Sequence, residues 1–326
     1  MNTPPTDGIR VDAATLRDFT RRIFAAVPLP AADADLVAGL LVDTELRGVV
    51  SHGVVQVERY VRAFVDGTAN PDPDIRVLRE GPTTAALAGD GGLGIVVGTR
   101  AMRLAIDKAA EYGLGAATTT YHDHIGSAGK YIRMAMRRDM VGICFSGRNA
   151  APEYSGEASV QHSIQGSPPL AFGAPAGPER PDFALDMASH MPWDEECFAR
   201  MPQVYFKALG FSHLANIISG TLGGQMLPEF DRRNIAYPGA NQSGFFMAID
   251  IARFVDAGAF KGDMDRLMDG VAGMRPFPGQ DEAALPGGPE WKRDKEYARD
   301  GIPISADAVA GLKRVAAELA VETPWG

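Results

Sequence analysis

Cysteine, long apolar runs and basic residues are all scarce in this sequence. Its 326 residues include only 2 cysteines, Cys144 and Cys197, too few for a disulfide scaffold and in keeping with a reducing compartment. No apolar run approaches the roughly 18 residues that a membrane span needs, and the first residues show neither a basic leader nor an apolar signal-peptide core. We therefore expect a soluble, cytoplasmic protein with no membrane partner.

The charge balance is acidic. There are 32 Lys+Arg against 41 Asp+Glu, a formal net charge of −9, whereas a protein that binds phosphate backbones normally carries a basic surface. Nucleic acid is therefore not an expected partner. Hydrophobic residues make up 45% and charged residues 22%, ordinary values for a globular protein, so the length allows two domains around a buried site for a small molecule.

The first part of the chain has apolar residues at helical spacing. Helices are predicted over 13–26, with Asp12 as N-cap, over 31–47 and over 54–65. The turn-rich segment Asn70-Pro71-Asp72-Pro73 then marks a boundary. We expect a helical domain over 1–70, rejoined by C-terminal helices within 290–326, and an α/β domain over 71–289.

Beyond this boundary, strand-like and helix-like runs alternate. The strands predicted from apolar runs are 83–87, 115–121, 141–145, 169–173, 183–186 and 245–251. The helices predicted between and after them are 97–112, 127–138, 207–222, 260–274 and 306–321, the last with Ser305 as N-cap. The fold class is therefore α/β (α+β): a helical N-terminal part and an α/β body.

A G-x-G-x-x-G pattern occurs at residues 89–94, after a predicted strand and before a predicted helix. Such a pattern is typical of dinucleotide-binding Rossmann folds. The acidic residue expected about 20 positions later is missing, however, and the motif does not open the fold. We favour a plain glycine turn here.

Among the six histidines, two have a context that suggests chemistry. His52 follows Ser51 at a junction between helices, where a hydroxyl could orient the imidazole for proton transfer. His124 lies at the end of a predicted strand, before a glycine-rich helix start of the kind that holds ligands in α/β proteins. His122 and His124 have H-x-H spacing, but no Asp, Glu or Cys cluster accompanies them, so we expect no metal site. No role is expected for His190 and His213; His162 is the sixth histidine.

Two charged residues stand in apolar segments. Asp186 ends an apolar run, and its carboxylate could orient a histidine and stabilise imidazolium, or equally cap a following helix. Lys207, between Phe206 and Ala208, could contact a cofactor phosphate or be a surface lysine whose stem lies along apolar neighbours. The sequence leaves both pairs of alternatives open.

Taken in order, several segments resemble the type 2 malate/L-lactate dehydrogenase family, which includes sulfolactate and ureidoglycolate dehydrogenases and piperideine-carboxylate reductases. The similarity extends over nearly the whole chain. The matching segments are Glu45-Leu46-Arg47-Gly48-Val49-Val50-Ser51-His52-Gly53 with Tyr60, His124-Ile125-Gly126-Ser127-Ala128-Gly129-Lys130-Tyr131, Pro168-Pro169-Leu170, Asp186, Phe206-Lys207-Ala208, and Leu285-Pro286-Gly287 with Glu290.

The resemblance implies a non-Rossmann, sulfolactate-dehydrogenase-like fold with a mixed sheet, a homodimer, and NAD or NADP as cofactor. The reaction it implies is hydride transfer between NAD(P)H and a 2-oxo acid or cyclic imino acid. His52 would be the proton donor, with Ser51 and Asp186 relaying protons or orienting it. The substrate would lie near Gln56, Arg59, Tyr60 and His124, and the cofactor would lie along His124, Gly126, Ser127, Lys207, Pro286, Gly287 and Glu290.

The chain also departs from the family pattern. Gln56 stands where the family usually carries an arginine that binds the substrate carboxylate, and Arg59, one helical turn on, could substitute. A segment normally present between the equivalents of Ser189 and Lys207 is missing. An atypical substrate is therefore expected. The alternatives are a cofactor-independent acid/base enzyme (a lyase, isomerase or cyclase) that has lost nicotinamide, and a catalytically silent binding protein.

Overall fold

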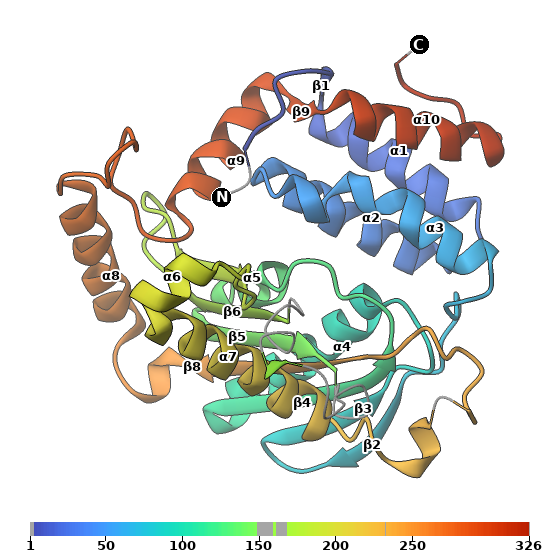
Figure 1. Cartoon of the computed structure of the whole chain (residues 1–326), viewed down its shortest axis with the longest axis horizontal. Helices are drawn as coiled ribbons and strands as arrows, with labels where there is room; N and C mark the ends of the chain where they lie inside the picture. Colours follow the sequence, from blue (N-terminus) through green and yellow to red (C-terminus); the bar gives the residue numbers. More distant parts are fainter. Residues whose placement is uncertain (1–2, 149–158, 161–167, 232, 326) are drawn as a thin grey trace.

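A seven-stranded mixed sheet with helices on both faces forms the body of the protein (Figure 1). The computed structural model describes residues 3–148, 159–160, 168–231 and 233–325. The strand order is β2-β3-β4-β8-β5-β6-β7, and only β3 and β4 are parallel neighbours. The strands are β2 (Arg76–Glu80), β3 (Thr84–Ala88), β4 (Leu114–His122), β5 (Met140–Gly147), β6 (Pro169–Ala174), β7 (Phe183–Ala188) and β8 (Gln242–Asp250).

The largely antiparallel order excludes a Rossmann sheet, which is mostly parallel. The G-x-G-x-x-G segment is a buried turn between β3 and α4 (Gly94–Tyr112). A Cβ added at Gly94 would lie 2.2 Å from the carbonyl oxygen of Asp123 in the next loop, so protein fills the space that a pyrophosphate would need. The structure agrees with the interpretation of this motif as a glycine turn.

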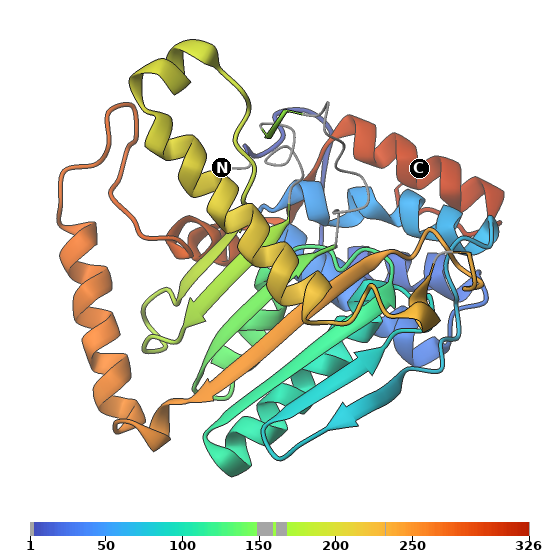
Figure 2. The same cartoon turned by 60° about the horizontal axis from the view of Figure 1, so that its bottom comes forward.

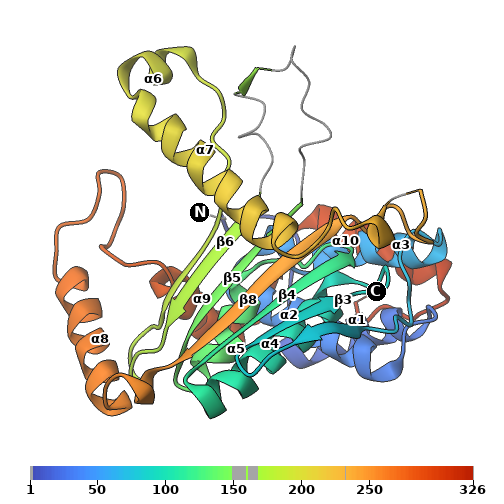
Figure 3. The same ribbon diagram turned by 90° about the horizontal axis from the view of Figure 1, so that it is seen from below.

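Two helices separate the sheet from a layer of N- and C-terminal helices. One face of the sheet is covered by α4 and by α5 (Gly129–Met136), and the opposite face by α7 (Pro202–Asn216) (Figures 2 and 3). The outer layer contains α1 (Ala13–Ala25), α2 (Ala31–Leu46), α3 (Val57–Val65), α9 (Gly288–Asp300) and α10 (Ala306–Glu318). The side chains of Asp12 and Ser305 cap α1 and α10, as predicted.

The two ends of the chain meet in this outer layer. Strand β1 (Ile9–Val11) pairs antiparallel with β9 (Ile302–Ile304), so the layer combines residues from both termini. One continuous hydrophobic core joins it to the sheet, because Leu16 and Val37 of the outer helices belong to the same cluster as Val97 and Phe246.

Several sequence predictions differ from the structure at element ends. The helix predicted from Lys207 begins five residues earlier, with α6 (Glu195–Arg200) before it, because Asp194 and Pro202 start helices that the apolar pattern does not reveal. The helix predicted over 260–274 is α8 (Ala257–Ala272), capped by Asp256. Strands β1, β2 and β9 were not predicted because they are short or exposed on both faces.

Candidate active site

The turn that carries His52 is hydrogen-bonded to a buried carboxylate, that of Glu45. Residues Val50–His52 and Val54–Gln56 form two successive 3-10 turns after α2. The Oε1 atom of Glu45, a side chain only 3% exposed, accepts a hydrogen bond of 2.7 Å from the Val54 N–H. A Cβ on Gly53 would lie 2.1 Å from that oxygen, so only glycine lets the turn approach Glu45 so closely.

His52 and His124 face each other with their ring centroids 5.5 Å apart. A 2.9 Å hydrogen bond joins Ser51 Oγ to His52 Nδ1, as the Ser-His pair suggested, and engages one ring nitrogen. The other nitrogen, Nε2, is therefore the one suited to exchange a proton with a ligand. His124 Nδ1 bonds at 2.9 Å to the hydroxyl of Tyr60, which is fully buried. Two differently held imidazoles thus share one site.

Both imidazoles favour the neutral form. Burial lowers the pKa of His52, the charge of Lys130 lowers it further, and Asp186 opposes the shift. Burial also lowers the pKa of His124 to about 3, with Arg59 and His52 adding to the effect. A neutral imidazole can accept a proton, and protonated His52 is correspondingly a strong donor.

Asp186 lies on β7 and is tied to the loop that follows His124. Its Oδ2 atom accepts a 2.8 Å hydrogen bond from the Gly129 N–H at the start of α5, so the N-cap alternative for a following helix does not apply. The side chain opens into a cleft, but the surrounding protein raises its pKa above the usual value, while Gly129 and Arg133 oppose the rise. In the described part of the chain, charge rather than a hydrogen bond couples Asp186 to His52.

A cleft of about 1430 Å³ lies between the start of α5, β7 and the C-terminal segments; Asp186 lines it, whereas His52 and His124 are not among its lining residues. It brings together Ser127, Asp186, Pro286, Gly287 and Glu290, which the sequence assigned to the site from three distant segments. The Asp182 carbonyl oxygen would lie 2.3 Å from a Cβ on Gly287, and the Ala184 N–H donates to the Pro286 carbonyl, so this loop closes directly against β7. The volume is sufficient for a dinucleotide-sized ligand.

The cleft also presents cationic side chains that sequence reasoning missed. Arg47 and Arg133 line it and both bind Asp43, at 3.5 Å and 3.1 Å. The Nε atoms of both arginines are buried and have no hydrogen-bond partner among the described residues. Neither was predicted because isolated arginines give no sequence signal, although Arg47 lies in the segment that resembles the dehydrogenase family. Both guanidinium groups add positive charge to the wall of the cleft, which Asp43 offsets in part.

Two residues predicted to bind substrate have other partners. Gln56 donates from Nε2 to the Ser51 carbonyl at 2.8 Å, which leaves its buried Oε1 without a donor in the described structure. Arg59 is half-exposed and lies 3.4 Å from Asp123. The ion pair therefore holds Arg59 beside His124, and not at the position of Gln56, where it could replace the missing arginine.

The structure places other candidates outside the cleft. Lys207 is exposed on α7 and does not line the cleft. His122 is fully buried and bonds Thr119 Oγ1 at 2.8 Å, so the two histidines of the H-x-H pattern have different surroundings. His213 bonds the Leu209 carbonyl of its own helix, His190 is exposed, and His162 lies outside the described residues.

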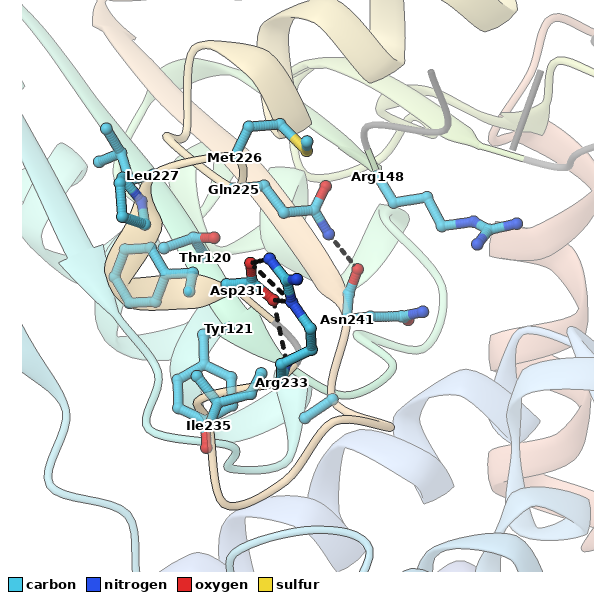
Figure 4. Close-up of a pocket in the computed structure, with 13 residues that line it drawn as sticks. Thr120, Tyr121, Arg148, Gln225, Met226, Leu227, Asp231, Arg233, Ile235 and Asn241 are labelled. Atoms are coloured by element: carbon cyan, nitrogen blue, oxygen red, sulfur yellow. Dashed lines mark hydrogen bonds and ion pairs between the residues drawn. The ribbon is translucent and has the colours of Figure 1, made fainter. Parts of the chain in front are cut away.

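A second cavity, of about 490 Å³, lies at the ends of β4 and β8 (Figure 4). Asp231 and Arg233 bind each other in it, with Nε 2.9 Å from Oδ1, and Gln225 donates to the Asn241 carbonyl. Tyr121 forms part of its wall with an unusual positive φ of 56°. Its charged pair is self-neutralised, and none of its lining residues is one that the sequence assigned to the site, so this cavity is a weaker candidate than the cleft.

Comparisons with known proteins bear on this site. A family model described as malate/L-lactate dehydrogenase matches residues 11–192 and 196–313. The chain is 32% identical to the malate dehydrogenase of Pyrococcus horikoshii, covering 96% of each chain, and that protein's solved structure superposes with a TM-score of 0.85 over 99% of each chain. It is 30% identical to the L-sulfolactate dehydrogenase of Methanocaldococcus jannaschii, over 89% of this chain and 92% of that one. The ureidoglycolate dehydrogenase (NAD(+)) of Escherichia coli is 24% identical, over 92% and 93%.

The comparisons confirm the non-Rossmann mixed-sheet fold expected from the resemblance. The alignment with the Pyrococcus protein spans 353 positions against 326 residues here, so at least 353 − 326 = 27 positions fall opposite gaps in this chain. The family match is itself interrupted between residues 192 and 196, within the interval from Ser189 to Lys207. Among the described residues, no helix is long and apolar enough to cross a membrane.

Proposed function

Because the chain belongs to the malate/L-lactate dehydrogenase family, we propose that it is an NAD(P)-dependent oxidoreductase that transfers a hydride between NAD(P)H and a 2-oxo acid or cyclic imino acid. Its relatives include malate, sulfolactate and ureidoglycolate dehydrogenases, which supports hydride transfer in general terms. The observation that carries the proposal is the convergence of Asp186 and the 286–290 loop on one cleft, with Asp186 charge-coupled to His52.

The acid/base step is assigned to His52. When a carbonyl is reduced, its carbon receives the hydride and its oxygen needs one proton, which His52 supplies from Nε2. In the reverse direction neutral His52 removes that proton from the hydroxyl. Ser51 fixes the ring through Nδ1, and Asp186 stabilises the imidazolium through its charge. His124, held by Tyr60, is placed to bind the reacting oxygen or the ring of the cofactor.

The cleft fits a dinucleotide with anionic phosphates. The guanidinium groups of Arg47 and Arg133, which line the cleft, favour negative charge there, and Ser127, two residues before α5, lines it with a hydroxyl. Gly287, with φ of +98°, allows backbone to close over the opposite side. The cofactor supplies the hydride; the protein orients it, excludes water and moves the proton. Pro286 and Glu290 line the cleft, where we expect them to contact the cofactor. Gly126 and exposed Lys207 do not line it, so their proposed contacts require the cofactor to extend beyond the cleft.

We assign an atypical substrate to the site. The buried Oε1 of Gln56 offers an acceptor where the family carries a cation, so it favours a substrate with an N–H or O–H donor at that position. The 27 or more positions that fall opposite gaps in this chain support the same conclusion, because they set it apart from a malate dehydrogenase. They also support a second candidate function, cofactor-independent acid/base chemistry at His52 and Asp186.

Cofactor titration separates these two functions. Addition of NADH or NADPH to the protein is expected to change nicotinamide fluorescence saturably and to raise the melting temperature. The stabilisation should reach about 2.7 kcal/mol at 100 times Kd. NAD+ and ADP-ribose serve as controls for binding through the dinucleotide alone. Absence of any shift at millimolar NADH and NADPH would contradict the dehydrogenase and leave the cofactor-independent enzyme.

We also propose that residues 1–70 and 290–326 form the helical domain of a homodimer. The pairing of β1 with β9 supports the first part. Phe206, Leu214 and Ile217 share one face of α7 and its extension and are 63%, 39% and 56% exposed, an apolar stripe suited to a second copy. Figure 3 shows α6 and the adjoining end of α7 extending away from the sheet.

Light scattering after gel filtration tests the dimer. The wild-type chain is expected to elute at twice the monomer mass, and Phe206→Glu combined with Ile217→Glu is expected to give monomers, because two charges enter the apolar stripe. Val65→Glu, at an exposed position on α3, is the matched control and should remain dimeric. A monomeric wild-type chain at high concentration would contradict the proposal.

A further inference from the structure

Lys130 is an unusual buried cation next to the proposed site. It is the second residue of α5, and only 1% of it is exposed. Its Nζ atom has no hydrogen-bond partner among the described residues. The other buried lysine, Lys108, is 9% exposed but is fully engaged, with the Glu80 carboxylate and the Gly81 carbonyl each 2.8 Å from Nζ. Two buried lysines in one chain therefore differ in whether they are paired.

The amine of Lys130 lies directly behind the loop of residues 124–129, called the glycine loop below. A Cβ added at Gly126 would lie 2.2 Å from Nζ and 3.6 Å from Ile95 Cδ1, and Gly126 has a φ of +71°. The absence of a side chain at Gly126 and its left-handed backbone thus create the space for the amine. The next residues of the same loop, Ser127 and Gly129, line the cleft on the other side.

This position puts the amine among the charged groups of the site. The Gly129 N–H, adjacent to Lys130 in the chain, binds Asp186, and Arg133 lies one turn further along α5. The charged and titratable groups that act on Lys130 are Arg133 on its own helix, Asp186 on β7, Asp43 on α2 and Cys144 on β5. Those that act on His52 are Lys130, Asp186 and Arg59. Lys130 and His52 therefore share Asp186 as their common anion.

A buried amine without a partner is costly. Transfer of a charged or even a neutral amine out of water destabilises the fold unless hydrogen bonds replace the lost hydration, and such groups occur mainly where function requires them. Burial lowers the pKa of Lys130 to about 7, with Arg133 adding to the shift and Asp186 opposing it. An isosteric apolar side chain would avoid this cost.

We propose that Lys130 is a positioning residue whose buried amine, behind the glycine loop, keeps Asp186 ionised and His52 neutral between catalytic cycles, at a cost to the stability of the fold. This inference rests on the proposed role of His52. Protonation of His52 is then readily reversed, because the charge of Lys130 destabilises the imidazolium while the charge of Asp186 stabilises it. Lys130 thereby biases His52 toward releasing its proton to the reacting oxygen.

The test is Lys130→Met, with Lys108→Met as the matched control. Lys130→Met should raise the melting temperature by about 2–5 °C at pH 6, because an unpaired amine is replaced by an apolar chain of similar length. The native state disfavours the proton on Lys130, so wild-type stability rises with pH above about 7 and the gain should shrink toward pH 10. Lys108→Met should instead lower the melting temperature, because it leaves Glu80 and Gly81 without their donor.

The functional readout is the titration of His52, followed by NMR of the imidazole and assigned with His52→Asn. This measurement needs neither substrate nor cofactor. Lys130→Met should move the His52 midpoint to higher pH, and the alkaline limb of the reduction profile should move with it; Lys108→Met should change neither. An unchanged His52 midpoint, or a lower melting temperature in Lys130→Met, would overturn the inference. A shifted midpoint in a protein that binds no NADH would retain it while refuting the dehydrogenase.

Discussion

Replacing His52 with asparagine is expected to lower kcat for reduction by about 10³-fold, within the range that a positioned acid/base group contributes. Asparagine keeps a polar side chain that can accept the Ser51 hydrogen bond but cannot donate a titratable proton. His52 is only half-buried, so the substitution should preserve both folding and NADH binding. The measurement is single-turnover oxidation of NADH with whichever 2-oxo or cyclic imino acid of a panel the wild-type protein reduces.

The same residue sets the direction of the pH dependence. Reduction needs protonated His52 and oxidation of the hydroxy acid needs the neutral form. Because burial and Lys130 lower the pKa of His52, reduction should weaken as the pH rises through and above that pKa, while oxidation should strengthen. Both pH effects should vanish in His52→Asn.

His190→Asn is the matched control, since His190 is exposed and does not line the cleft. It should retain wild-type turnover and pH dependence. An active His52→Asn protein would transfer the proton-donor role to His124, whose ring is next to His52 and is held by Tyr60. In that event His124→Asn should remove the turnover instead.

The second prediction with a large effect concerns Glu45 and the stability of the fold. Burial raises the pKa of Glu45 to about 7 from 4.5, while the Val54 N–H opposes the rise. The native state therefore binds more protons than the unfolded state between these values, so the contribution of Glu45 to stability is complete below pH 4.5 and is lost as the pH rises through about 7. At about 1.36 kcal/mol for each unit, the loss over the shift from 4.5 to about 7 amounts to about 3 kcal/mol.

Glu45→Gln should remove this loss. Glutamine keeps the acceptor for the Val54 N–H but has no charge to bury, so the variant should be more stable than the wild type at pH 8 and about equal at pH 4.5. Urea unfolding across this range measures the difference in free energy of unfolding between the two proteins. Buried histidines such as His122 and His124 do not affect this difference, because both proteins contain them. Exposed Glu322→Gln controls for the removal of one negative charge. A difference independent of pH would contradict the burial of an ionisable Glu45.

Patterns along the chain were sufficient to predict most elements of the body and the family. Apolar periodicity located β4, β5 and β8, and the caps at Asp12 and Ser305 located two helix starts, because these signals are local. The paired ends β1 and β9 were missed, and α9 was expected only as one of the helices within 290–326, without bounds of its own. Their stability comes from packing between opposite ends of the chain, which no local pattern records.

The contacts of the candidate site also divide into those that the sequence could predict and those that only the folded chain reveals. Ser51 and His52 are adjacent in sequence, so their hydrogen bond could be anticipated from residue types alone. The contact between Gly129 and Asp186, 57 residues apart, could not, and neither could the self-contained bond between Gln56 and the Ser51 carbonyl. Arg59 as a replacement carboxylate ligand and Lys207 as a cofactor ligand stay predictions, since the first is held by Asp123 and the second is remote from the cleft.

The sequence by itself determined the family, the mixed α/β class and the identity of the proton-transferring histidine as a candidate, because these depend on residue types and spacing along the chain. Only the tertiary structure decided which groups share an environment. Lys130 and Glu45 look like ordinary residues of amphipathic helices. Lys130, however, is buried behind the glycine loop with no hydrogen-bond partner for its amine in the described part of the chain, and Glu45 is buried against the His52 turn. Burial and charge proximity are properties of the packed chain, and they set the protonation states on which the proposed chemistry depends.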